Sequence, residues 1–190
     1  MKALEEKILN EGTVLDGNIL KVGSFLNQQL DVDFLMEMGS EIKKIYSDVK
    51  ATKILTIESS GIAIAVAAGA VMHLPVVFAK KSKSSNVSDD VYKTVVHSFT
   101  HNTDYDVVVA KEFLSSDDKI IVIDDFLANG KALEGLFDIV NQSGAELLGA
   151  TCAIEKGFQH GGDKLRSQGI RIESLAVVDE MSKDGIKFRN

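Results

Sequence analysis

The sequence from Ile120 to Ala132 is Ile-Ile-Val-Ile-Asp-Asp-Phe-Leu-Ala-Asn-Gly-Lys-Ala. The run from Lys119 to Asp124 is apolar almost without interruption, which is typical of a strand buried on both faces. Two carboxylates end this strand, and a turn of small residues leads into a helix predicted from Lys131 to Ser143, with Gly144 at its C′ position. A buried strand that turns directly into a helix is the repeating unit of α/β proteins.

The same alternation recurs on both sides of this stretch. Further strands are predicted at Lys53–Ile57, Pro75–Ala79, Leu147–Ile154 and Ile172–Val178, and helices at Ile62–His73 and Leu165–Gln168. Strands that are apolar on both faces and alternate with helices predict an α/β fold, in which a central, mainly parallel sheet is flanked by helices.

Two regions depart from this alternation. Before residue 50, helical patterns at Lys2–Asn10 and Asp31–Asp48 flank an extended piece, Asn18–Val22, and predict an N-terminal hood over one edge of the sheet. Residues 80–111 contain a polar segment and two strand-like runs, Val91–Thr100 and Asp106–Lys111. This second region predicts a mobile lid loop and hairpin, with a plain surface loop as the alternative.

Length and composition limit the class of protein. A chain of 190 residues fits a single domain, 1–190. It carries 21 basic and 28 acidic residues, a net charge of −7, whereas nucleic-acid binding needs a basic surface. The longest apolar stretch, Ile62–Val71, is too short to span a bilayer, and the single cysteine, Cys152, fits a reducing compartment. We therefore expect a cytoplasmic protein without nucleic-acid or membrane partners.

The turn after Asp124 and Asp125 is the main candidate site, because ligands of α/β sheets bind outside the carboxyl ends of the strands. It consists of Ala128, Asn129, Gly130, Lys131 and Ala132. Consecutive backbone N–H groups at a helix N-terminus suit a phosphate, and Lys131 adds a positive charge. The two carboxylates are acceptors for a vicinal diol, so a sugar phosphate fits both halves. The alternative is that the aspartates only cap the helix.

These residues resemble a known family. Ile121–Asp125 followed by Ala128–Ala132 is similar to the diphosphoribosyl-binding signature of the type I phosphoribosyltransferases. Glu58–Ala63 lies at the first strand end, where that family has its pyrophosphate loop, and Lys80-Lys81 lies at the second, ahead of a hood segment with Ser98-Phe99-Thr100. The similarity covers essentially the whole chain.

The resemblance implies an activity. Members of the family transfer the 5-phosphoribosyl group from 5-phosphoribosyl-1-diphosphate (PRPP) to a base and release diphosphate. Two stretches, Leu20–Val22 with Ser24–Gln28 and Ile154–Gln159, are most similar to members that act on xanthine in purine salvage, giving xanthosine 5′-monophosphate. There are two alternative functions. One is a PRPP-sensing regulator, for which no DNA-binding motif is evident; the other is an adenine-specific enzyme, which Lys156 disfavours because adenine offers a donor at C6.

The resemblance also implies roles for single residues. The catalytic carboxylates would be Asp124 and Asp125. PRPP would be bound by Ala128, Asn129, Gly130, Lys131, Ala132, Ser59, Ser60, Gly61, Lys80 and Lys81. The base would be bound by Leu20, Asn27, Lys156 and Phe158. Mg²⁺ is expected mainly on the diphosphate, because this ion keeps its waters and takes few protein ligands. The sequence shows no His, Cys and carboxylate cluster with transition-metal spacing, so no zinc site is expected. The family likeness further implies a homodimer.

Overall fold

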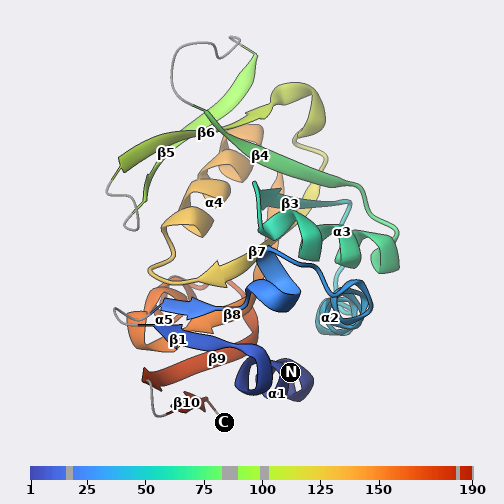
Figure 1. Cartoon of the computed structure of the whole chain (residues 1–190). Helices are drawn as coiled ribbons and strands as arrows, with labels where there is room; N and C mark the ends of the chain where they lie inside the picture. Colours follow the sequence, from blue (N-terminus) through green and yellow to red (C-terminus); the bar gives the residue numbers. More distant parts are fainter. Residues whose placement is uncertain (16–18, 83–89, 99–102, 183–184, 190) are drawn as a thin grey trace.

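The computed structural model describes residues 1–15, 19–82, 90–98, 103–182 and 185–189. Its main feature is an eight-stranded sheet of order β10-β9-β8-β7-β3-β4-β6-β5. The strands are β3 (Lys53–Ile57), β4 (Val76–Ser82), β5 (Val91–Ser98), β6 (Thr103–Ala110), β7 (Lys119–Leu127), β8 (Glu146–Lys156), β9 (Ile172–Ser182) and β10 (Gly185–Phe188). In Figure 1 this sheet extends from the β5–β6 hairpin at the top to β10 at the bottom.

The centre of the sheet is parallel. β3 pairs in parallel with β4 and β7, β7 with β8, and β8 with β9, while β10, β6 and β5 join antiparallel at the edges. The predicted α/β fold with a mainly parallel sheet is therefore confirmed. Because these strands are parallel, the carboxyl ends of β3, β4, β7 and β8 all lie at one edge of the sheet.

Helices cover both faces of the sheet. They are α1 (Lys2–Glu11), α2 (Val32–Ile45), α3 (Gly61–Met72), α4 (Lys131–Ser143) and α5 (Gly161–Ser167). One hydrophobic cluster joins the sheet to α1, α2 and α3, and a second joins it to α4 and α5. Figure 1 shows α2 and α3 side by side, as their many mutual contacts require. No helix within the described ranges is long and apolar enough to cross a membrane.

The ends of two helices follow from local sequence. Asp31 caps α2, because its carboxylate accepts a hydrogen bond from the backbone N–H of Phe34 at 3.1 Å. Gly144 ends α4 in the left-handed conformation, at φ 73°, as the sequence predicted.

The N-terminal region holds more structure than its pattern indicated. After α1 come a two-stranded hairpin of β1 (Thr13–Leu15) and β2 (Ile19–Lys21), then a π-helical turn, η1 (Gly23–Asn27). β2 matches the predicted extended piece, of which Asn18 lies outside the described residues. The amine of Met1 donates to the carbonyl of Leu175 on β9, which fastens the start of the chain to the sheet.

The predicted lid hairpin is, in its paired part, an extension of the main sheet. Thr103–Tyr105, expected in the connecting loop, belong to β6, and β6 pairs with β4 so that Lys81 lies opposite Val107. β5 packs on α4, where a Cβ on Gly135 would lie 2.5 Å from Val96. Residues 83–89 and 99–102, which include Phe99 and Thr100, lie outside the described residues, so movement of a lid stays a prediction.

Candidate active site at the carboxyl edge of the sheet

Asp124 and Asp125 end β7 in different surroundings. The side chain of Asp124 is buried, with the residue 5% exposed, whereas Asp125 is half-buried. The backbone N–H of Asp125 donates to Oδ1 of Asp124 at 2.9 Å. Burial and the neighbouring Asp125 charge raise the pKa of Asp124 well above its usual value, and Lys81 acts in the opposite direction. The edge therefore holds one shielded and one open carboxyl group.

The turn after β3 packs directly on the shielded carboxyl. A Cβ on Gly61 would lie 2.9 Å from Oδ1 of Asp124 and 2.5 Å from Oγ1 of Thr56, so only glycine permits this approach. The peptide bond between Glu58 and Ser59 is cis. The Ser60 side chain makes no capping hydrogen bond to α3. The predicted pyrophosphate loop thus lies against the aspartate pair.

The turn after β7, called here the phosphate loop (Ala128–Ala132), opens α4. Gly130 has φ 86° and ψ 0°, a left-handed conformation that suits glycine. The backbone N–H of Lys131 donates to Oδ1 of Asn129 at 3.1 Å, and its Nζ lies 2.7 Å from Oε2 of Glu134. Burial alone would raise the pKa of Glu134, but Lys131 and Lys164 bind it and lower the pKa. The Lys131 ammonium is therefore already paired, which leaves mainly backbone N–H groups and the helix N-terminus for an anion.

Of the two predicted lysines on β4, only Lys81 is tied to the aspartates. Its backbone N–H donates to Oε1 of Glu58 at 2.5 Å, and its Nζ lies 5.2 Å from the centre of the Tyr105 ring. Lys80 is exposed and, as the next residue of a strand, points to the opposite face.

Tyr105 is a residue at this edge that the sequence did not reveal. Burial raises its pKa, and the charge of Asp124 adds to the effect, while its ring centre lies 5.2 Å from Nζ of Lys81. Tyr105 comes from β6, and nothing in its spacing pointed to the site, because the pairing of β6 with β4 alone brings it there.

The predicted base-binding residues lie on the neighbouring strand and under the hood. Glu155 pairs with Leu127, so Lys156 at the end of β8 lies beside the phosphate loop. Its Nζ is 5.7 Å from the centre of the Phe126 ring, and burial lowers its pKa. Phe158 and Phe126 pack against the hydrophobic cluster that contains Leu20, which is 6% exposed. Asn27 is half-buried at the end of η1.

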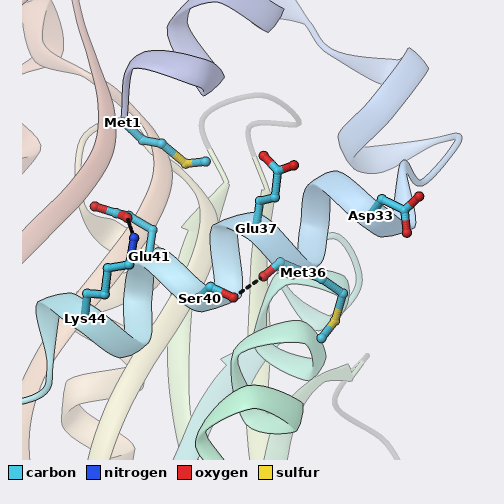
Figure 2. A pocket seen from close by; sticks show the side chains of 7 residues that line it. All are labelled: Met1, Asp33, Met36, Glu37, Ser40, Glu41 and Lys44. Atoms are coloured by element: carbon cyan, nitrogen blue, oxygen red, sulfur yellow. Dashed lines mark hydrogen bonds and ion pairs between the residues drawn. The ribbon is translucent and has the colours of Figure 1, made fainter.

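A pocket of about 380 Å³ lies elsewhere, between the chain start and α2. Figure 2 shows its lining: Met1, Asp33, Met36, Glu37, Ser40, Glu41 and Lys44. None of the predicted site residues is among them, and three carboxylates against one lysine do not suit an anionic ligand. Among the residues that the structure describes, no three His, Cys, Asp or Glu side chains are grouped to hold a metal ion.

Comparisons with known proteins agree with this geometry. The chain is 52% identical to xanthine phosphoribosyltransferase 1 of Clostridium perfringens over the full length of both. It is 50% identical to xanthine phosphoribosyltransferase of Lachnoclostridium phytofermentans over 100% of this chain and 98% of that protein. The structure of adenine phosphoribosyltransferase from Rhodothermus marinus superposes with a TM-score of 0.74, covering 94% of this chain and 100% of that one. At 14% identity, that likeness shows the fold alone.

The family assignment rests on sequence as well as on shape. Residues 29–180 match the phosphoribosyl transferase domain. This range includes the aspartate pair, the phosphate loop and the ends of β3, β4 and β8, which together form the edge described above. The chain therefore belongs to the phosphoribosyltransferase family of enzymes.

Proposed function

We propose that this enzyme transfers the 5-phosphoribosyl group from PRPP to xanthine, giving xanthosine 5′-monophosphate and diphosphate in purine salvage. One observation carries the proposal: the carboxylate pair of β7, the phosphate loop and Lys156 lie together at the carboxyl edge of two adjacent parallel strands. A sugar phosphate needs the carboxylate pair for its hydroxyls and the phosphate loop for its phosphate. A base bonded to C1 of the sugar needs a recognition group next to them, and Lys156 is in that position.

The aspartates suit the ribose. Displacement at C1 passes through a cationic, oxocarbenium-like sugar, which negative charge stabilises. Asp125, the more open of the pair, would bind the ribose hydroxyls, and the buried Asp124 would add negative charge next to it. Gly61 borders the Asp124 carboxyl group, and Ser59, Ser60 and Gly61, together with Lys81, would receive the diphosphate. Lys80, which points away, fits a contact with PRPP less well.

The identity of the base is argued from Lys156 and from the named relatives. An ammonium donates hydrogen bonds only, so Lys156 matches the oxygen at C6 of xanthine and not the amino group of adenine. Leu20 and Phe158 belong to the apolar surroundings that suit a purine ring, and Asn27 provides an amide for its edge. The two curated relatives are both named for xanthine.

Three further assignments belong to this proposal. The oxygen donors Asp124 and Asp125 fit Mg²⁺, but two carboxylates are too few to hold the ion, so the diphosphate and water would supply the other ligands. A homodimer is supported by exposed apolar side chains on adjacent helices, Val32 on α2 and Val66 on α3. Cys152 is a buried cysteine that forms no disulfide, which fits the cytoplasm.

The test is a product assay with PRPP, Mg²⁺ and each of four purines. We expect nucleotide from xanthine at the highest kcat/KM, with guanine and hypoxanthine weaker. Product from adenine alone would overturn the choice of base, and PRPP binding without product from any base would favour a regulator.

A further inference from the structure

Glu155 is a buried charge that the proposed reaction does not use. Its side chain is fully buried at the end of β8, directly before Lys156. Arg166 of α5 binds both of its oxygens, with Nη1 2.9 Å from Oε1 and Nη2 2.6 Å from Oε2, and the hydroxyl of Ser174 donates to Oε2. Such a two-pronged pair fixes direction as well as distance. It therefore holds α5 against the end of β8 in one orientation.

The start of α5 passes this constraint to the phosphate loop. A Cβ on Gly162 would lie 2.1 Å from Oε1 of Glu155, and a Cβ on Gly161 would lie 2.2 Å from the carbonyl oxygen of Ala128 and 2.7 Å from the backbone nitrogen of Gly130. Two consecutive glycines thus fit against the buried carboxylate on one side and the loop backbone on the other. A larger residue at Gly162 would displace the Glu155 carboxylate, and a larger residue at Gly161 would displace the backbone of the phosphate loop.

A second link joins the same helix to α4. Lys164 of α5 places its Nζ 2.7 Å from Oε1 of Glu134, whose other oxygen holds Lys131. This contact is at the surface, where ion pairs contribute little, so the buried pair is the stronger constraint.

We propose that Glu155 and Arg166 are positioning residues that, through the Gly161–Gly162 start of α5, fix the phosphate loop relative to Lys156. The proposal rests on the proposed function, in which the loop binds the 5′-phosphate and Lys156 binds the base. A nucleotide spans both subsites at once, whereas ribose 5-phosphate occupies only one. Loss of the Glu155–Arg166 pair, called here the clamp, would therefore weaken binding of the nucleotide far more than binding of the sugar phosphate. The reason is that a displacement of about 1 Å can cost up to 10²-fold in a site that must align two groups at once.

Two variants test this. Replacing a buried ion pair by apolar residues of similar volume is often neutral for stability, so the double variant Glu155→Met with Arg166→Met removes the clamp without leaving a lone charge. Arg166→Lys keeps the charge but loses the two-pronged geometry. The control is Asp48→Asn, which removes the charge from a surface pair in which Nη1 of Arg171 donates to both carboxylate oxygens of Asp48, at 2.9 and 2.8 Å.

The measurement is calorimetric titration of each folded protein with xanthosine 5′-monophosphate and with ribose 5-phosphate. In the double variant we expect the Kd of the nucleotide to rise about tenfold or more and the Kd of ribose 5-phosphate to rise less than about threefold. The difference between the two changes should be smaller in Arg166→Lys, and the control should show none. Should the double variant not fold, Arg166→Lys alone decides. An equal loss of affinity for both ligands, or no loss for either, would overturn the positioning role. A wild-type protein that does not bind the nucleotide would instead refute the proposed function.

Discussion

The ammonium of Lys81 lies 5.2 Å from the centre of the Tyr105 ring, which joins β4 to β6 next to the aspartate pair. Cation–π contacts of this kind hold a lysine in place at about 0.5–1 kcal/mol when exposed. From this position Lys81 favours the ionised form of Asp124, against burial and the charge of Asp125, which both raise its pKa.

Lys81→Met is therefore expected to shift the pH dependence of the reaction. Removing the cation raises the pKa of Asp124 further, so the ionised carboxylate forms only at higher pH. The acidic limb of kcat/KM for PRPP, measured across pH, moves upward. In Lys80→Met, which removes the charge from the opposite face, the limb keeps its position; equal shifts in both variants would contradict the assignment.

Asp125→Asn should act on both turnover and pH dependence. We expect kcat to fall by about 10²-fold or more, the scale of losing one electrostatic contact in a site. Loss of the Asp125 charge lowers the pKa of Asp124, so the acidic limb moves downward, opposite to Lys81→Met. The protein should remain folded by circular dichroism, since Asp125 is half-buried. Asp117→Asn, at an exposed aspartate before β7, is the control, and wild-type turnover in folded Asp125→Asn refutes the role.

Gly130→Ala should damage PRPP binding as well as stability. At φ 86°, an added Cβ costs about 1–2 kcal/mol and would lie 3.3 Å from Leu165. Gly144→Ala is a matched control, because Gly144 has φ 73° and its Cβ would lie 3.3 Å from Ser116, at the other end of the same helix. Chemical denaturation should show similar losses in both, whereas KM for PRPP rises only in Gly130→Ala. A rise in both would mean that the effect is global.

Lys156→Ala should weaken binding of the base and leave binding of PRPP unchanged. Losing the donor leaves the C6 oxygen unpaired at a cost of about 1–3 kcal/mol, or roughly 5- to 150-fold in kcat/KM for every 6-oxopurine. Steady-state kinetics with xanthine, guanine and hypoxanthine measure this, and Lys187→Ala, at an exposed lysine of β10, is the control. A raised KM for PRPP with unchanged base affinities would move Lys156 to the phosphate side.

Asn27→Ala should act at a different edge of the base. Asn27 lies at the end of η1 in the hood, so its loss should change the preference between xanthine and hypoxanthine, which differ at C2. The ratio of kcat/KM for these two purines is the measurement. An unchanged ratio would exclude Asn27 from base selection.

The parts that sequence predicted are those with local causes. β7, the phosphate loop and α4 follow one another along the chain, and each is marked by its own residues: a continuous apolar run, the aspartates, and glycines that take left-handed conformations at both ends of α4. The pairing of Lys131 with Glu134 is equally local, three residues apart on one helix, and that spacing could have revealed it.

The parts that sequence missed depend on pairing between distant segments. β1 and β10 are short and partly exposed, and they exist because a neighbouring strand pairs with them. Tyr105 reaches the aspartates only through the β4–β6 ladder, and Glu155 meets Arg166 only because α5 folds back on β8. The local sequence around Tyr105 and Glu155 does not distinguish them from an ordinary surface tyrosine or glutamate.

The position of β7 between β3 and β8 also determines when β3 gains its second neighbour during synthesis. β3 is complete at Ile57, but the neighbour on its second edge begins at Lys119, 62 residues later (119 − 57). At about 5–20 residues per second, the ribosome needs about 3–12 seconds to cover that distance. Throughout this interval the nascent chain carries an apolar strand with at least one unpaired edge, which is a template for pairing with another chain. Chaperone protection of this enzyme is therefore most needed before its central strand has left the ribosome.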